Sequence, residues 1–346
     1  MNILLSDFNS YKSIVLAKSL KKFYKEINVF ALVEKKKAYS SKYFTGTIIL
    51  EDLHDIAKLN SILNQYNINY FVPVKGEYLS FLLKNKNKFE KVLDYWGAFD
   101  SFDLLNDKLR LHNLALKTGI LVPHSFSSVE KLKLPCVMKP ISLSAARSVR
   151  YIRTNTDLEK AKEVYSGKEY ILQEYIEGTG VGYSVFCRDG KIIVGYGHKR
   201  LAEYPISGGS SVYRTCYEDT RMHDVAELII KETNWSGFAM FEFKLTKDNR
   251  LFLIEVNPRI WGSINQGLQY GLNYFEPLLG SRSHKEIHHD INTYLSPLIY
   301  SSLIKYMLKL NFNPLVKFFK YIRKNKADIS MIDDPAGWLS MVFRKF

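Results

Sequence analysis

The first hundred residues alternate between short apolar runs and longer amphipathic segments. The apolar runs cover residues 3–5, 28–33, 48–50 and 70–74, which is the length of buried strands. Between them apolar residues recur at helical spacing, as in residues 14–20. Strands that alternate with helices predict a parallel α/β sheet whose ligand-binding loops lie at the carboxyl ends of the strands.

The pattern changes near residue 106. A helix is predicted over residues 106–119, where Gly119 ends it. Tight turns such as Asp189-Gly190 then indicate antiparallel hairpins. The predicted strands are residues 135–138, 170–173, 183–186, 191–196, 237–245 and 251–256. The expected parts are an N-terminal α/β domain over residues 1–105, an α+β domain over 106–280 with subdomains at about 106–170 and 171–280, and a helical extension over 281–346.

Composition narrows the class of protein. Of the 346 residues, 46% are hydrophobic and 24% charged, which excludes a disordered chain and a small disulfide scaffold. The net charge of +14 favours polyanionic partners such as nucleotides or an anionic membrane surface. Cations do not alternate with aromatic residues on a recognised module, so we expect no nucleic-acid partner.

Cysteine usage and hydropathy bear on the compartment. The three cysteines lie far apart, which fits a reducing cytoplasm better than a disulfide framework. Residues 1–9 show no charged leader before an apolar run, and no stretch reaches the roughly 20 apolar residues of a membrane span. We expect a cytoplasmic protein, with peripheral contact at the inner membrane surface as an alternative.

Two carboxylates and an amide form the strongest candidate site. Glu255 and Asn257 lie two apart in a predicted strand, so their side chains share one face. Glu242 lies on the neighbouring hairpin strand. Carboxylate and amide oxygens suit Mg²⁺, and charges within such apolar runs need partners. The alternative is a pair of structural carboxylates bonded to lysine or arginine.

Two lysines favour a binding site over a pair of structural carboxylates. Lys108 opens a predicted helix, and Lys139 ends a strand just before Pro140. Each alone is most simply a solvated lysine. Together with the acidic cluster, they indicate cations for phosphate oxygens beside ligands for a metal ion.

At this point the chain resembles the ATP-grasp superfamily of carboxylate–amine ligases. The motifs occur in the family's order across residues 106–280, and residues 1–105 resemble the domain that precedes an ATP-grasp module. The matching stretches are Asn106-Asp-Lys108, Pro135-Cys-Val-Met-Lys139-Pro140, Ile171-Leu-Gln-Glu174-Tyr-Ile-Glu177-Gly, Phe241-Glu242 and Glu255-Val-Asn257-Pro-Arg259.

The resemblance implies roles for the cations. Lys108 and Lys139 would contact the α- and β-phosphates of ATP, and Lys199 with Arg200 resembles a further phosphate-facing pair. Arg259 lies where the family places a cation beside an acyl phosphate. Catalysis would therefore rest on Arg259 and Lys139.

It also implies a nucleotide pocket with Mg²⁺ or Mn²⁺. Gln173, Glu174 and Ile176 would hold the adenine, and Glu242, Glu255 and Asn257 would hold the metal. Glu177 is the nearest candidate for the ribose hydroxyls. Residues 141–148 lack the glycines usual in the family's phosphate flap, and the sequence does not say whether this flap closes. Residues 207–211 are a candidate phosphate- or substrate-binding loop, with a plain surface loop as the alternative.

The implied reaction joins a carboxylate to an amine through an acyl phosphate, with ATP consumed. The carboxylate is an amino acid, a short peptide or a sugar acid, the last in envelope polysaccharide biosynthesis. Two alternatives stay open: an ATP-grasp enzyme with a thiol or other acceptor, and a non-catalytic ATP-binding sensor. A homodimer is expected on base rates alone.

The C-terminal extension is basic. Residues 281–346 contain 11 Lys and Arg and 5 Asp and Glu, a net charge of +6. Asn313 is predicted to cap a helix that continues with Pro314. Either two helices pack on the body with solvated basic faces, or residues 297–326 dock on anionic lipid. His284, His288 and His289 form a short cluster, and the first two have the i, i+4 spacing of zinc-binding pairs. No third zinc ligand is apparent in the local sequence, so these histidines most simply lie on the surface.

Overall fold

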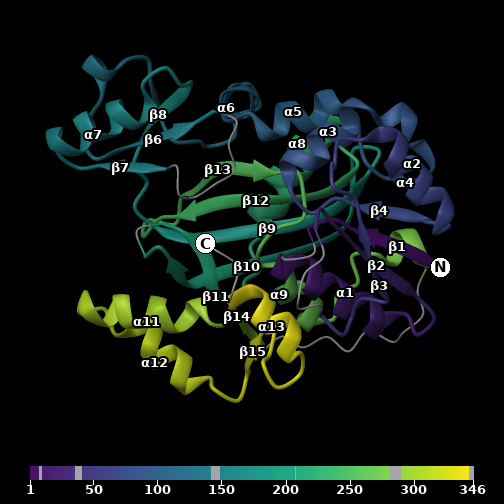
Figure 1. The fold of residues 1–346 in the computed structure, drawn as a ribbon. Coiled ribbons are helices and arrows are strands. Elements are labelled where there is room, and N and C mark those ends of the chain that lie inside the picture. The colour runs from purple at the N-terminus through teal and green to yellow at the C-terminus, as the bar shows by residue number, and fades with distance from the viewer. Residues whose placement is uncertain (8–9, 36–40, 142–148, 207, 281–289, 343–346) are drawn as a thin grey trace.

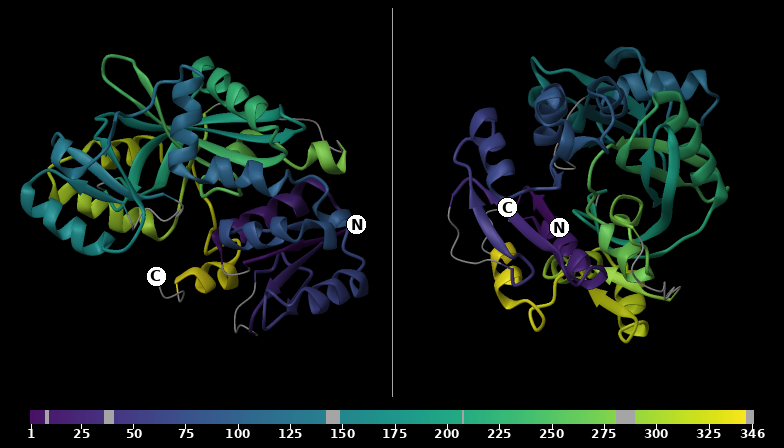
Figure 2. Two further views of the ribbon diagram at one scale, coloured as in Figure 1. Left: turned by 90° about the horizontal axis from the view of Figure 1, so that it is seen from above. Right: turned by 90° about the vertical axis from the view of Figure 1, so that its right-hand side faces the viewer.

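The computed structural model describes residues 1–7, 10–35, 41–141, 149–206, 208–280 and 290–342. The chain forms three sheets with covering helices, and the C-terminal segment lies along the lower edge in the view of Figure 1. Seen from above, the N-terminal domain lies beside the large sheet, with the last helix next to it (Figure 2).

The N-terminal domain is the predicted parallel sheet. Its strands are β1 (Asn2–Leu5), β2 (Asn28–Val33), β3 (Gly46–Ile49) and β4 (Tyr70–Val72), in the order β3-β2-β1-β4. All its pairings are parallel, and β1 is buried from its second residue onward. The helices of this region are α1 (Tyr11–Phe23), α2 (Ile56–Gln65), α3 (Gly76–Lys84), η1 (Lys86–Lys88), α4 (Glu90–Leu93) and α5 (Phe99–Asn106).

A small antiparallel sheet follows. Its strands are β5 (Ser125–Phe126), β8 (Tyr170–Glu174), β6 (Cys136–Pro140) and β7 (Arg150–Ile152), in that order, with α6 (Lys108–Lys117), η2 (Val129–Lys131) and α7 (Asn155–Tyr165) around it. The helix predicted over residues 106–119 begins later, at Lys108. Its start is set by Asp107, whose carboxylate accepts hydrogen bonds from the N–H groups of Leu109 and Arg110.

The third sheet has seven strands in the order β13-β12-β9-β10-β11-β14-β15. They are β13 (Leu251–Asn257), β12 (Gly237–Leu245), β9 (Thr179–Arg188), β10 (Lys191–Tyr204), β11 (Ser210–Cys216), β14 (Asn292–Tyr294) and β15 (Asn325–Ala327), with the helices α8 (Thr220–Thr233), α9 (Ile264–Tyr270) and α10 (Glu276–Leu279). The candidate binding segment 207–211 runs into strand β11, which begins at Ser210 and pairs with the end of β10. Its described residues, 208–211, line the cavity described below, and their contact with phosphate or substrate stays a prediction.

An aromatic cluster joins the N-terminal domain to this sheet. The ring centroid of Trp96 lies 5.6 Å from that of Phe238 and 6.0 Å from that of Trp235, and all three residues are buried. Gly237 has a φ of +113°, and a Cβ there would lie 2.4 Å from the Trp96 ring. The close approach of the two parts therefore requires glycine at this position.

The C-terminal segment packs against the edge of the large sheet. Helices α11 (Leu298–Leu308) and α12 (Asn313–Lys320) bury Ile299, Leu303 and Phe318 against side chains of β10 and β11, and α13 (Pro335–Val342) ends the described chain. Asn313 is the first residue of α12 rather than its cap, a shift of one position. Among the described residues, no helix is long and apolar enough to span a membrane.

Candidate active site

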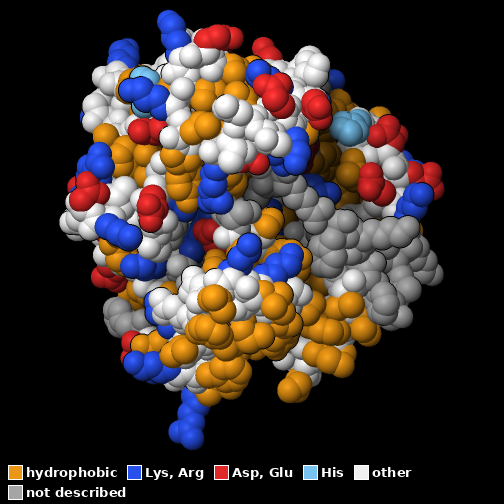
Figure 3. Space-filling view, turned by 90° about the vertical axis from the view of Figure 1, so that its left-hand side faces the viewer, with side chains coloured by type: hydrophobic (Ala, Val, Ile, Leu, Met, Phe, Trp, Pro, Cys, Tyr) orange, Lys and Arg blue, Asp and Glu red, His pale blue; other side chains and the backbone are white. Residues whose placement is uncertain are grey.

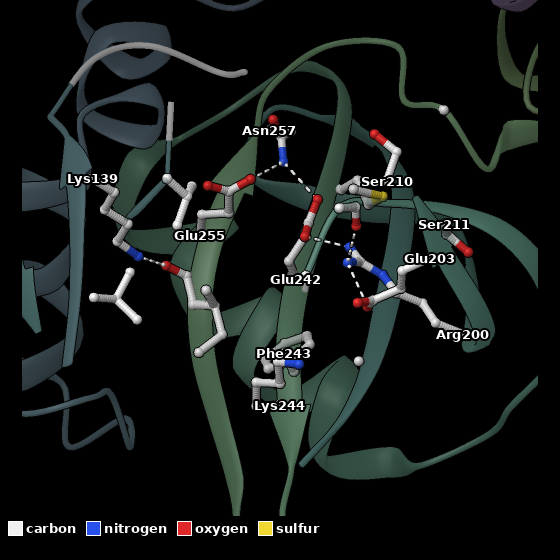
Figure 4. Close-up of a pocket in the computed structure, with 18 of the residues that line it drawn as sticks. Lys139, Arg200, Glu203, Ser210, Ser211, Glu242, Phe243, Lys244, Glu255 and Asn257 are labelled. Atoms are coloured by element: carbon white, nitrogen blue, oxygen red, sulfur yellow. Dashed lines mark hydrogen bonds and ion pairs between the residues drawn. The ribbon is translucent and has the colours of Figure 1, made fainter. Parts of the chain in front are cut away.

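The two carboxylates and the amide meet on one face of the large sheet. In the pairing of β12 with β13, Glu242 lies opposite Glu255 and Met240 opposite Asn257. The amide nitrogen of Asn257 donates to one carboxylate oxygen of Glu242 at 3.3 Å and of Glu255 at 3.1 Å (Figure 4). The predicted set therefore forms one cluster, built by strand alternation and a hairpin register.

These side chains line a cavity of about 390 Å³ between the small and large sheets. Ten of the twelve residues predicted for the site contribute to its wall, and these ten span 151 positions of the chain, from Lys108 to Arg259. They are Lys108, Lys139, Gln173, Glu174, Ile176, Arg200, Glu242, Glu255, Asn257 and Arg259.

The two lysines face the acidic cluster from the other side. Lys139 is buried at the end of β6, and its Nζ donates to the carbonyl of Ile254 at 3.2 Å. The Nζ of Lys108 lies 3.8 Å from a carboxylate oxygen of Glu255. Burial lowers the pKa of Lys139 to about 8, although Glu255 opposes the shift. A cation so placed favours an anionic ligand, because burial of its charge is costly.

The pKa values of the two glutamates shift in opposite directions. Burial raises the pKa of Glu242, even though Arg200 forms an ion pair with it. Burial would raise the pKa of Glu255 too, but Lys108 and Lys139 outweigh it and the pKa is lowered. Glu255 is therefore the more firmly ionised of the pair.

Arg200 bridges two acidic side chains. It pairs with Glu242 and lies 3.3 Å from Glu203, and its Nη1 donates to the Gly209 carbonyl at 3.3 Å. Its buried Nε has no hydrogen-bond partner among the described residues. The guanidinium thus keeps one donor available beside the cavity.

The structure does not bring Lys199 and Glu177 into this cavity. Lys199 follows the opposite face of β10 from Arg200, and its Nζ lies 5.4 Å from the centroid of the Tyr217 ring. Glu177 is exposed and pairs with Lys247 at 3.6 Å, in an open groove next to the cavity. Their proposed contacts with phosphate and ribose stay predictions.

Gln173 and Glu174 line the end of the cavity where the two sheets adjoin. The Gln173 amide nitrogen lies 3.2 Å from both His112 Nδ1 and Ser125 Oγ. Its buried Oε1 has no partner among the described residues. The Glu174 carboxylate instead accepts from the His124 N–H at 2.8 Å, which holds the local backbone. Gln173 therefore offers an acceptor that a ligand would satisfy.

Sequence reasoning missed several wall residues. His198 is buried, and its Nε2 lies 3.3 Å from Ser263 Oγ. Burial keeps its pKa below the ordinary value for histidine, and two nearby arginines add to this, so the ring is neutral. Tyr11 and Lys12 reach the cavity from the start of α1. Only the packing of the N-terminal domain brings them there, and no local pattern predicts it.

Other candidates fall outside the described residues. These are most of the flap, residues 142–148, position 207, and His284, His288 and His289. Among the described residues, no group of three or more His, Cys, Asp or Glu is placed to hold a metal. The acidic cluster has two carboxylates, and the polar side chain that contacts both of them is the amide of Asn257.

The comparisons with known proteins agree on one family of domains. Residues 105–263 match the family model of the ATP-grasp domain. The carbamoyl phosphate synthase large chain of Vibrio parahaemolyticus is 23% identical over 180 residues, which covers 46% of this chain and 17% of that relative. The chain thus matches a small part of that curated relative.

Solved structures share the fold over most of the chain. An N5-carboxyaminoimidazole synthetase from Staphylococcus aureus, complexed with ADP, superposes with a TM-score of 0.68 at 15% identity over 84% of this chain and 80% of that one. The biotin carboxylase of Campylobacter jejuni superposes with a TM-score of 0.63 at 15% identity, over 84% of this chain and 74% of that one. The L-amino acid ligase of Bacillus licheniformis superposes with a TM-score of 0.61 at 16% identity, over 84% of this chain and 78% of that one. Residues 105–263 therefore match the ATP-grasp domain family, and the chain has the fold of ATP-grasp enzymes.

Proposed function

We propose that this protein is an ATP- and Mg²⁺-dependent ligase that activates a substrate carboxylate as an acyl phosphate and joins it to an amine. One observation carries the proposal. Glu242, Glu255 and Asn257 meet in a cavity whose opposite wall supplies Lys108 and Lys139. Metal ligands that face phosphate-binding cations are what phosphoryl transfer requires of a protein.

The donor set fits Mg²⁺. Two carboxylates and an amide oxygen are hard ligands, and the Asn257 amide nitrogen now stands between the two carboxylates. The Asn257 amide oxygen accepts a hydrogen bond from Arg259 Nη2 at 2.8 Å, so metal binding through this oxygen would require the amide to turn away from Arg259. When bound, Mg²⁺ supplies positive charge that offsets charge on phosphate oxygens.

The cavity also fits ATP. Its volume of about 390 Å³ lies within the range of small-molecule sites. The unpaired Gln173 Oε1 suits the amino group of adenine. Lys108, Lys139 and Arg259 line the same cavity and suit the phosphates and the reacting carboxylate.

The chemistry needs no protein nucleophile. A carboxylate oxygen of the substrate attacks the γ-phosphorus, the bond to the β-phosphate oxygen breaks, and ADP leaves. An amine then attacks the acyl carbon, loses a proton and displaces inorganic phosphate. Arg259 and Lys139 contribute by holding the anionic groups in place and by stabilising charge that develops on their oxygens.

The substrate is proposed at the level of its class. An amino acid, a short peptide or a uronic acid fits the side of the cavity formed by Tyr11, Lys12, Arg259 and Ser263, because two cations there suit a carboxylate. A place in envelope polysaccharide biosynthesis, a cytoplasmic location and a homodimer belong to the same proposal.

The test is ADP release with Mg²⁺-ATP and paired pools of carboxylic acids and amines, followed by mass spectrometry of the product. We expect an amide and stoichiometric ADP and phosphate. Lys139→Met should lower the rate about 100-fold, because it removes a preorganised cation. Glu159→Gln, in an exposed pair on α7, should leave the rate unchanged. A thioester or carboxylated product would point to the other acceptors, and ATP binding without turnover in any pool would contradict the ligase.

A further inference from the structure

The outer surface of α11, α12 and the segments next to them is apolar. Nine large apolar side chains there are exposed, from 41% for Met307 to 81% for Leu310. They are Tyr300, Ile304, Met307, Leu308, Leu310, Phe312, Val316, Phe319 and Ile322, and we call this surface the C-terminal face. Figure 3 shows hydrophobic side chains gathered over these helices, below a hollow that contains acidic and basic groups.

Helical spacing explains why these side chains point outward. On α11, Tyr300, Ile304 and Met307 recur four and three positions apart on one side, and Ile299 and Leu303 are buried on the other. On α12, Phe318 is buried while Phe319 next to it is exposed. Each helix therefore has two apolar sides, and the large sheet covers only one of these sides. A contiguous exposed apolar surface of this kind marks an interaction site.

Charge identifies what covers the face. Residues 291–327 contain seven Lys and Arg and no Asp or Glu. Six of the seven cations are exposed, and Lys317 is partly covered. Lys324 pairs with Asp290 at 2.8 Å, and Lys305 lies over the ring of Tyr204. An apolar surface with a predominantly cationic fringe is complementary to a layer that is apolar inside and anionic at its surface.

We propose that the C-terminal face docks the protein on an anionic membrane surface. The apolar side chains enter the boundary between headgroups and acyl chains, and the lysines meet the phosphate groups of the lipids. A second copy of the chain is disfavoured as the occupant, because seven cations would meet seven cations. A nucleic acid is disfavoured because most of the exposed side chains are aliphatic and offer no stacking surface.

Docking would bring the candidate active site close to the membrane. A groove of about 440 Å³ runs between the face and the site. Tyr306, Asn313 and Lys317 line it from the helices, and Arg200 and Glu203 line both the groove and the main cavity. This inference goes beyond the ligase proposal, because membrane binding needs no turnover.

The test is co-sedimentation of the full chain with vesicles of pure phosphatidylcholine and with vesicles of phosphatidylcholine and phosphatidylglycerol. We expect binding to the anionic vesicles that weakens as salt is added. Phe319→Ser with Ile322→Ser should lower the partition coefficient roughly tenfold or more. Lys309→Gln with Lys320→Gln should lower it about fivefold per lysine.

Two exposed isoleucines far from the face provide the control. Ile49→Ser with Ile193→Ser removes similar apolar area and should leave binding unchanged. Point variants are needed, because truncation at Gly280 would remove β14 and the buried partner of Arg214. No binding to anionic vesicles, or equal binding by the face and control variants, would overturn the proposal. So would a dimer in light scattering that the Phe319→Ser and Ile322→Ser changes dissociate.

Discussion

Arg214 and Asp328 form an ion pair that is completely buried where the C-terminal segment joins the large sheet. Asn265 donates to the Asp328 carboxylate at 3.0 Å, and Arg214 donates to the Ser211 carbonyl at 3.0 Å. Burial raises the pKa of Asp328, although Arg214 opposes the shift. The two charges are tolerated only because each satisfies the other.

Arg214→Leu should therefore lower the free energy of unfolding by about 3–5 kcal/mol, because it leaves the Asp328 carboxylate buried without its counter-ion. Urea unfolding at neutral pH measures the change. Arg221→Leu is the matched control, since its pair with Asp219 is 41% exposed on the arginine side and should be worth no more than about 1 kcal/mol. Equal losses for the two variants would refute the assignment.

At the residue scale, the sequence predicted those side chains whose positions follow from strand alternation. Glu255 and Asn257 share a face because they are two apart, and the hairpin brings Glu242 opposite. The same rule places Arg200 in the cavity and Lys199 on the other side, so the pair could have been separated from the sequence. Tyr11 could not have been found, because its position depends on the packing of one domain on another.

At the element scale, the segment before α13 ties the C-terminal end to the N-terminal domain. The Asp333 carboxylate accepts hydrogen bonds from Lys18 at 2.5 Å, Tyr43 at 2.6 Å and Lys42 at 3.0 Å. Burial alone would raise the pKa of Asp333, but these donors outweigh it and hold the pKa below the ordinary value for aspartate. The carboxylate therefore stabilises the folded state when it is ionised.

Asp333→Asn should lower the free energy of unfolding at pH 7 by about 1 kcal/mol, a modest figure because a third of the side chain is exposed. The native pKa lies below that of the unfolded chain, so the contribution is present above about pH 4 and is lost as the pH falls further. Unfolding of both proteins between pH 7 and pH 2 measures it. A difference that grows as the pH falls would contradict this account.

Elements were predictable where a periodic pattern was long. The parallel strands of the N-terminal sheet and the hairpin strands β12 and β13 match the predicted runs closely. Strand β11 was missed because its start, Ser210-Ser211, follows two glycines and is typical of a loop. Strands β14 and β15 have three residues each, and their pairing depends on the edge that β11 provides.

At the scale of the whole molecule, the candidate active site exists because three separately built parts converge. The small sheet supplies Lys139, the large sheet supplies Glu242 and Glu255, and the N-terminal domain closes one side with Tyr11. The family match covers residues 105–263, whereas the wall of the proposed site also includes Tyr11 and Lys12 from outside that range. The central claim is that this convergence binds Mg²⁺ and ATP together.

Calorimetric titration of ATP into the wild-type protein and into Glu255→Gln, with and without Mg²⁺, tests that claim most directly. We expect Mg²⁺ to strengthen ATP binding to the wild type, and we expect this gain to fall at least about tenfold in the variant, because a charged ligand is lost. Glu159→Gln, in an exposed pair on α7, should retain the gain, and thermal unfolding should confirm that both variants are folded. Equal Mg²⁺-dependent affinity in the wild type and Glu255→Gln, or no ATP binding by the wild type, would contradict the account.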